Sequence, residues 1–248
     1  MAHAFPEDLT MAFQPIFDLE AEGYVYAYEA LLRRWDGGAA VFRLNKGRDV
    51  ERKSLDSSCR ARAMEMALER NLKAPLSVNA SPSALTDKKH GLEETCHQAH
   101  QLGFPISDLI VEVTENERIE DLAYFSDYIN EFRRDGIRIA IDDFGSGYSG
   151  LSVLSDFLPD IVKIDKTLVK GFDRDKCRQI LVTGIKRLCD DLNLELVAEG
   201  VETPEQLEKL TDLGVKKFQG NGLSKPILGE APACNFKGIK MDKKKSVV

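Results

Sequence analysis

Apolar and β-branched residues recur in eight short segments along the chain. The segments are 11–19, 25–33, 76–81, 109–114, 137–144, 160–165, 194–200 and 215–220. Runs of this length bounded by turn residues are typical of strands. Helical patterns lie between them at 54–71, 91–103, 119–136, 175–193 and 203–214. The chain is therefore predicted to alternate strands and helices from its second strand onward.

This alternation predicts parallel strands, and eight of them predict a closed barrel. Only residues 20–24 separate the first two strands, whereas a parallel crossover needs a dozen or more residues, so this pair should be an antiparallel hairpin. The predicted fold is α/β, a modified TIM (β/α)8 barrel with an antiparallel first strand. We expect one domain over residues 1–248, with a core over about 11–230 and a C-terminal tail over 231–248.

Composition narrows the class of protein. The 248 residues carry a net charge of −7, which argues against broad nucleic-acid binding, and no sequence-specific nucleic-acid partner is expected. No apolar run approaches the roughly 20 residues of a membrane span, and the N-terminus lacks a secretion pattern. The five cysteines are scattered without CxxC spacing, which favours reduced thiols. A soluble cytoplasmic protein is predicted.

Polar side chains fall at corresponding positions of successive predicted strands. Glu29 lies within the second strand, and the others lie near the C-terminal ends of strands three to eight: Asn79, Glu112, Asp142, Asp143, Lys163, Asp165, Glu199 and Gln219. Taken singly, a glutamate such as Glu29 would more often be paired or solvent-facing. In a barrel, however, these strand ends form the face that carries the active site, so their recurrence favours a functional site.

The residue types indicate which chemistry this face could perform. Clustered carboxylates repel one another unless they are paired or bind metal. With one lysine and neither histidine nor cysteine among them, they suit Mg²⁺, Mn²⁺ or Ca²⁺ and not zinc. If Asp142 bridged two ions and Asp143 bound one, the site would resemble the two-metal centres of phosphodiester hydrolysis. Spacing alone leaves the number of ions open.

The loop after the fifth strand allows a second interpretation. Gly145, Gly147 and Gly150 match the GxGxxG dinucleotide-binding fingerprint, and Asp165 follows about 20 residues later. Two carboxylates directly before the glycines would, however, repel a pyrophosphate, and a connection without a role is a third interpretation. Strand alternation would send Asp142 and Asp143 to opposite faces. We therefore expect the strand to end at this pair and the backbone to turn there, as Gly145 and Gly147 permit.

Seven ordered motifs resemble one known family. The segments YEALLRRW, SVNAS, VEVTENE, IDDFGSGYSGL, VKIDKTLV, VAEGVET and QGNGLSKP occur in the order and approximate spacing of the EAL-domain family, bacterial phosphodiesterases of cyclic di-GMP. The tripeptide of that name is Glu29-Ala30-Leu31 here, and the resemblance spans roughly residues 11 to 228. It implies hydrolysis of cyclic di-GMP to linear pGpG in bacterial second-messenger signalling.

The resemblance also implies roles for particular residues. Glu29, Asn79, Glu112 and Asp142 would ligate one Mg²⁺ or Mn²⁺, and Asp142, Asp143 and Glu199 a second, with Ca²⁺ expected to inhibit. Lys163 would orient or help to activate the water. The implied substrate contacts are Gln14, Arg33, Asp165 and Gln219, and the implied loop support comes from Glu115, Gly145 and Gly147.

Two further expectations and one alternative follow from the resemblance. A homodimer and a regulatory protein partner are expected. The alternative is a catalytically silent cyclic di-GMP receptor that signals to a protein partner. Silent receptors usually lose metal ligands or the loop glutamate, and this sequence retains them, which favours the enzyme. Asn221 replaces the family's common aromatic after Gln-Gly, which affects the expected packing of guanine.

Overall fold

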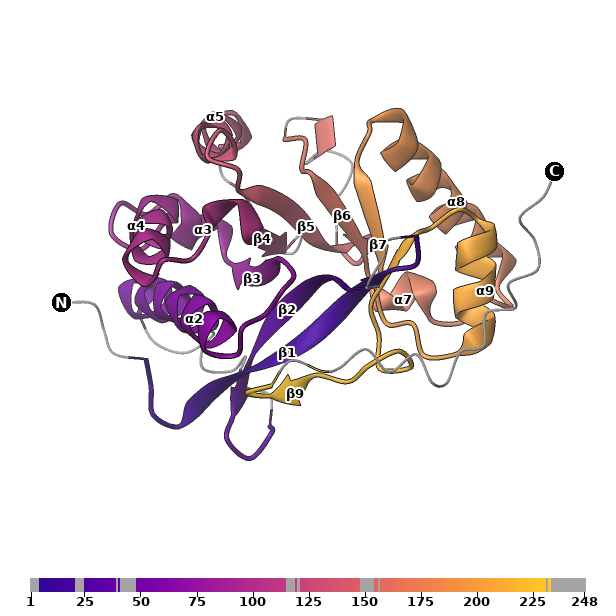
Figure 1. Cartoon of the computed structure of the whole chain (residues 1–248). Coiled ribbons are helices and arrows are strands. Elements are labelled where there is room, and N and C mark those ends of the chain that lie inside the picture. Colours follow the sequence, from indigo (N-terminus) through magenta and orange to yellow (C-terminus); the bar gives the residue numbers. More distant parts are fainter. Residues whose placement is uncertain are drawn as a thin grey trace.

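A closed barrel of eight strands organises the chain (Figure 1). The computed structural model describes residues 5–20, 25–38, 40, 48–114, 119, 121–147, 154–155, 157–230 and 232. Within these residues the barrel strands are β1 (Leu9–Asp18), β2 (Val25–Arg34), β3 (Leu76–Ala80), β4 (Leu109–Thr114), β5 (Arg138–Phe144), β6 (Ile161–Ile164), β7 (Glu195–Ala198) and β8 (Lys217–Phe218). They follow one another in chain order, and the pairing of β1 with both β2 and β8 closes the barrel.

Strand β1 runs against the rest of the barrel. It pairs antiparallel with β2 and with β8, whereas the neighbouring pairs from β2 to β8 are parallel. The predicted hairpin and barrel are thereby confirmed. A ninth strand, β9 (Ile227–Leu228), pairs with β1 at Ala12 and Phe13 and was not predicted. Two residues are too few for a periodic pattern to indicate a strand.

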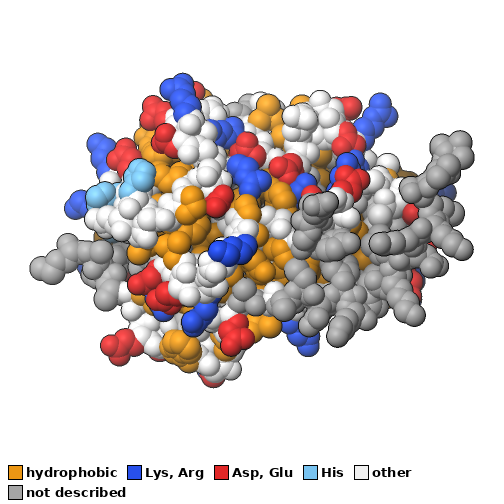
Figure 2. All heavy atoms as spheres, viewed as in Figure 1, with side chains coloured by type: hydrophobic (Ala, Val, Ile, Leu, Met, Phe, Trp, Pro, Cys, Tyr) orange, Lys and Arg blue, Asp and Glu red, His pale blue; other side chains and the backbone are white. Residues whose placement is uncertain are grey.

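Helices cover the outside of the barrel in the order predicted. The longer ones are α2 (Asp49–Glu69), α4 (Leu92–Leu102), α5 (Leu122–Arg133), α8 (Lys176–Asp191) and α9 (Pro204–Asp212), with short α3 (Pro82–Leu85), η1 (Ile106–Asp108) and α7 (Lys166–Val169). Helices α2 to α4 lie on one side of the strands and α8 and α9 on the other (Figure 1). Within the described ranges, no helix has both the length and the apolar character needed to cross a membrane. Charged side chains of both signs are interspersed on the face drawn in Figure 2.

The start of α9 shows how local sequence fixes an element. Thr203 accepts a hydrogen bond from the backbone N–H of Gln206, and the Gln206 side chain accepts one from the N–H of Thr203. Pro204 occupies the first turn, where its missing N–H costs nothing. This reciprocal capping box begins the helix directly after the loop that follows β7.

A small apolar layer fills the barrel interior. It consists of Ile16, Ala27, Ile110, Ala140, Ile161 and Val197, one residue from each of six strands. Side chains two residues apart in a strand point to the same face. Each of the last five therefore places an inward side chain two positions further on, at Glu29, Glu112, Asp142, Lys163 and Glu199. These polar side chains form a second layer inside the barrel, next to the apolar layer and nearer the C-terminal ends of the strands.

On the other side of the apolar layer, a second group of polar residues closes the end of the barrel at which the parallel strands begin. The Tyr26 hydroxyl accepts a hydrogen bond from Arg138 at 2.7 Å, and the Arg138 and Lys217 cations lie 5.2 and 4.8 Å from the Tyr26 ring centroid. Glu195 pairs with Lys217 at 2.9 Å. Burial raises the pKa of Tyr26, so the phenol stays neutral. Because its charges are mutually paired, this end serves stability, in keeping with the general division of labour in such barrels.

Candidate active site

The ammonium group of Lys163 is the centre of the polar layer. Its Nζ lies 2.7 Å from Glu112 Oε2, 2.7 Å from Glu199 Oε1, 3.1 Å from Asp142 Oδ1 and 3.5 Å from Glu29 Oε2. The Lys163 side chain is 1% exposed. Four carboxylates, three within β2, β4 and β5 and one directly after β7, thus meet at one buried cation, as the strand-end pattern predicted.

Neutral amides complete the surroundings of Glu29. Asn79 donates to Glu29 Oε1 at 3.0 Å, and Gln219 donates to Oε2 at 2.6 Å. Gln219 also lies 3.3 Å from Gln14, whose own amide donates to the carbonyl of Ser224 at 3.0 Å. The structure therefore joins Gln14, Asn79 and Gln219 to the carboxylate cluster through Glu29.

Sequence reasoning missed Ser77. Its hydroxyl donates to Glu112 Oε1 at 2.6 Å, and the residue is fully buried. The only sequence signal is its position, two residues before Asn79 in β3 and therefore on the same face. Serine carries no charge that would single it out in a search for ionisable groups. Ser77 orients the carboxylate that Lys163 contacts on its other oxygen.

A bulge in β5 brings Asp142 and Asp143 to the same place. The β5–β6 pairing runs from Ile141 opposite Val162 to Phe144 opposite Ile164, so both aspartates stand opposite the single residue Lys163. Asp143 adopts φ 56°, the left-handed conformation that aspartate tolerates better than most residues. The expectation that the strand ends at this pair is wrong, because β5 continues to Phe144. Carboxylate oxygens of Asp142, Asp143 and Glu199 consequently lie within 4.8 Å of one another.

Asp165 and Gly145 shape the chain around Asp143. Asp165 is 4% exposed, caps α7 by accepting from the N–H of Thr167 at 2.8 Å, and lies close enough to Asp143 to raise the pKa of that carboxyl group. Gly145 has φ 92°, and a Cβ there would come within 2.5 Å of Leu168. The predicted need for glycine is confirmed at this position.

Other predicted residues lie away from the cluster or outside the described residues. Arg33 is four residues beyond Glu29 on the same face of β2, and its guanidinium donates to the carbonyl of Leu32 at 2.9 Å. Glu115 and Gly150 lie outside the described residues. The roles predicted for Arg33, Gly147 and Glu115 stay predictions. The barrel topology is not the open sheet that the dinucleotide interpretation requires.

The electrostatics of the cluster are strongly perturbed. Burial, and then the nearby Glu29 carboxylate, raise the pKa of Glu112 to about 8. Burial also raises the pKa of Glu199 well above its usual range, and burial together with Asp142 and Asp165 raises that of Asp143 to about 6. Burial opposes ionisation of Glu29, but Lys163, Asn79 and Gln219 outweigh it and lower its pKa. The surrounding carboxylates raise the pKa of Lys163 against the effect of burial.

The donor set fits hard divalent cations. Four carboxylates contact one ammonium and a fifth, that of Asp143, lies beside them, so the deprotonated cluster carries negative charge in excess. Asp142 Oδ1 is buried and has no hydrogen-bond partner among the described residues, its cationic neighbour being Lys163. Oxygen ligands without histidine or cysteine are those that Mg²⁺ and Mn²⁺ prefer. Glu29, Asn79, Glu112 and Asp142 could hold one ion, and Asp142, Asp143 and Glu199 another.

The raised pKa values predict how stability depends on pH. Glu112 and Asp143 rise to about 8 and about 6 from ordinary values of 4.5 and 3.8, so between these limits the folded protein binds more protons than the unfolded chain. Their contribution to stability is present below the ordinary values and is lost as pH rises through the folded ones. Without added metal, the melting temperature should therefore fall between pH 5 and pH 9.

Calorimetric melting curves test this expectation. Mn²⁺ binds deprotonated carboxylates, so adding Mn²⁺ should increase the melting temperature more at pH 8.5 than at pH 6. A metal-free melting temperature that rises across this range would contradict the assignment of raised pKa values.

Comparison with known proteins identifies the family. The EAL domain family model matches residues 3–226. The chain belongs to the EAL domain family. A standalone versatile EAL protein from Vibrio cholerae O395, in its c-di-GMP-bound form, is structurally similar to this EAL domain. The TM-score is 0.85 at 35% identity, covering 92% of this chain and 96% of that one.

Two other relatives contain more than this EAL domain. Klebsiella pneumoniae BlrP1, in a complex with manganese and cyclic di-GMP, superposes with a TM-score of 0.82 at 33% identity, over 92% of this chain and 59% of that one. The blue light- and temperature-regulated antirepressor BluF of Escherichia coli K12 is 30% identical over 224 residues, which are 90% of this chain and 55% of BluF. The chain spans 20% to 22% of two further relatives that are named as cyclic di-GMP phosphodiesterases.

Proposed function

We propose that this EAL domain is a metal-dependent phosphodiesterase that hydrolyses cyclic di-GMP to linear pGpG. The observation that carries the proposal is the convergence of Glu29, Glu112, Asp142 and Glu199 on Lys163, with Asp143 brought alongside by the bulge in β5. Relatives named as cyclic di-GMP phosphodiesterases, and solved relatives that bind cyclic di-GMP with manganese, support the choice of substrate and ion.

The overall reaction requires little covalent chemistry from the protein. Water adds its oxygen to one phosphorus atom, the bond from that phosphorus to the 3′ oxygen breaks, and the 3′ oxygen gains a proton. Bound divalent cations supply Lewis-acid polarisation of the scissile phosphate and compensate its developing charge. The protein must therefore place charged groups beside the scissile phosphate and hold the substrate in the orientation in which water can attack.

The described side chains divide this work. Lys163 keeps its proton and holds four carboxylates in one geometry, and its ammonium can also offset charge that develops on the phosphate. Asn79 and Gln219 fix the Glu29 carboxylate by donating to both of its oxygens. Gln14, Gln219, Asp165 and Arg33 would contact the substrate, with the guanidinium of Arg33 suited to a phosphate.

A turnover assay combined with binding tests the proposal. The purified protein is incubated with cyclic di-GMP and Mg²⁺, Mn²⁺ or Ca²⁺, and pGpG is followed by chromatography. We expect pGpG with Mg²⁺ or Mn²⁺, and inhibition when Ca²⁺ is added. If calorimetry shows that cyclic di-GMP binds but no pGpG forms with either Mg²⁺ or Mn²⁺, the proposal that the protein is an enzyme is contradicted.

That contradicting outcome would favour a receptor. BluF, which matches across 90% of this chain, is named as an antirepressor, so a regulatory role for an EAL domain has a specific precedent among the relatives. Its expected signature is tight binding of cyclic di-GMP that persists when metal is removed. Either function is compatible with the predicted homodimer and regulatory protein partner, which stay predictions.

A further inference from the structure

Helix α2 carries a polar stripe that faces the segment after β3. Lys53, Asp56 and Arg60 are spaced three and four residues apart, so they lie on one side of the helix. Each contacts residues within 81–95, the segment that follows Asn79 and contains α3 and the first turn of α4. An interior stripe of this kind would ordinarily be apolar, so these polar contacts call for a physical reason.

The central contact fixes the backbone directly after β3. Ser81 is the first residue beyond the strand, and its N–H donates to Asp56 Oδ2 at 3.0 Å. Asn79 is two residues earlier and exposed at the barrel mouth, where its amide reaches Glu29 at 3.0 Å. Asp56 thus fixes the backbone two residues after Asn79, where the chain has just left β3.

Arg60 holds Asp56 in turn. The guanidinium is paired with the Asp56 carboxylate, donates to Thr95 Oγ1 at 2.9 Å, and donates to the carbonyl of His90. Its side chain is 0% exposed and that of Asp56 is 10% exposed. Burying such a pair costs several kcal/mol, and well-packed apolar residues of similar volume often replace it without loss of stability. Stability alone is therefore a poor explanation for the pair.

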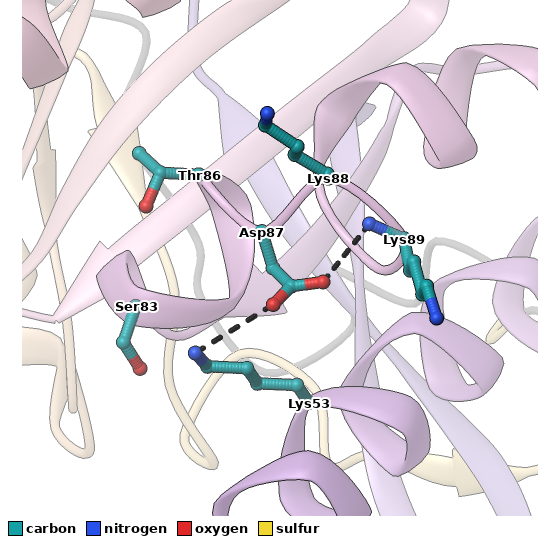
Figure 3. A pocket seen from close by; sticks show the side chains of 6 residues that line it. All are labelled: Lys53, Ser83, Thr86, Asp87, Lys88 and Lys89. Atoms are coloured by element: carbon teal, nitrogen blue, oxygen red, sulfur yellow. Dashed lines mark hydrogen bonds and ion pairs between the residues drawn. The ribbon is translucent and has the colours of Figure 1, made fainter.

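The outer contact of the stripe differs in kind. Lys53 lies 3.7 Å from Asp87 and borders a hollow of about 390 Å³ that is lined by Lys53, Ser83, Thr86, Asp87, Lys88 and Lys89 (Figure 3). The Lys53 side chain is 19% exposed, and it also pairs with Asp49 at 2.9 Å. Ion pairs that solvent can reach contribute little, so this contact supplies a matched control for the buried pair.

We propose that Asp56, held by Arg60, is a positioning residue that fixes Asn79 for metal binding at the barrel mouth. The inference rests on the proposed function, because it takes Asn79 to be a metal ligand. Partners that orient a ligand from behind typically change metal affinity or activity by about 10–100-fold when removed. Asp56 would act through the backbone of Ser81 and touches neither substrate nor metal.

Three variants test the proposal. Asp56→Ala removes the acceptor, Asp56→Asn retains an acceptor oxygen for the Ser81 N–H, and the double variant Asp56→Leu with Arg60→Met replaces the pair by apolar side chains so that the protein stays folded. Lys53→Met is the control on the same helix and the same segment. The measurements are Mn²⁺ affinity from the electron paramagnetic resonance of free Mn²⁺, hydrogen exchange of peptides within 76–86, and turnover.

The expected pattern is specific to positioning. Asp56→Ala and the double variant should weaken Mn²⁺ binding about 10–100-fold and speed exchange near Ser81, with KM for cyclic di-GMP within about twofold of the wild type. Asp56→Asn should recover most of the affinity, and Lys53→Met should match the wild type. Wild-type Mn²⁺ affinity in the folded double variant would overturn the proposal. Failure of the wild-type protein to hydrolyse cyclic di-GMP, with the variants still altering Mn²⁺ affinity, would instead overturn the proposed function alone.

Discussion

Replacing Glu29 with glutamine should lower the turnover of cyclic di-GMP on the order of 10²–10³-fold, because a proposed metal ligand would lose its charge. Glu29 accepts hydrogen bonds from Asn79 on one oxygen and from Gln219 on the other, and it faces Lys163. A glutamine of the same shape must turn its NH₂ group toward one of these donors. The change therefore removes charge and also breaks a hydrogen bond inside the cluster.

The control for Glu29→Gln is the same substitution at Glu65. Glu65 lies on α2, is 46% exposed and pairs with Arg62, remote from the barrel mouth. Glu65→Gln should keep wild-type turnover, and circular dichroism should show both variants folded. Steady-state kinetics at saturating Mn²⁺ provide the measurement. Turnover within a few fold of the wild type in Glu29→Gln would show that the carboxylate is not a ligand.

The second large effect is expected on stability. Lys163→Met should destabilise the metal-free protein by about 3–5 kcal/mol, because it leaves the ionised Glu29 buried without its cation in a cluster that also holds Glu112, Glu199 and Asp142. Added Mn²⁺ should restore part of this loss, since the ions compensate the same carboxylates. Turnover should stay low even with metal, because the ammonium also positions the site.

Denaturant unfolding with and without Mn²⁺ measures this effect. Lys216→Met is the control, because Lys216 is 56% exposed and pairs with Glu20, which is 65% exposed. It should unfold at the wild-type denaturant concentration in both conditions. A metal-free Lys163→Met protein as stable as the wild type would mean that the cluster does not depend on this ammonium group.

The alternation of eight strands with helices predicted the barrel, because helical crossovers join parallel strands and eight such strands close on themselves. The polar residues near the C-terminal ends of the strands could be predicted too, because ionisable groups at equivalent strand ends must converge once the sheet closes. The path of the chain at Asp142 and Asp143 could not be predicted. An aspartate in the left-handed region is uncommon, so sequence reasoning assigned the change of face to the glycines that follow.

Residues that support the cluster were harder to predict than its carboxylates. Ser77 has no charge, and its importance depends on the hydrogen bond that it donates to Glu112 on the neighbouring strand. Asp56 and Arg60 read in sequence as an ordinary helical ion pair, four residues apart, and only tertiary packing makes Arg60 fully buried against the loop that follows Asn79. Contacts between distant segments carry no local signal, so they become visible only in three dimensions.

The central claim is that the carboxylates around Lys163 hold the ions used in catalysis. Anomalous difference maps from crystals grown with Mn²⁺ test it most directly. The account predicts peaks bonded to Asp142, one shared with Glu29, Asn79 and Glu112 and the other with Asp143 and Glu199. Crystals that contain Mn²⁺ elsewhere but show no anomalous peak on Asp142 would contradict it.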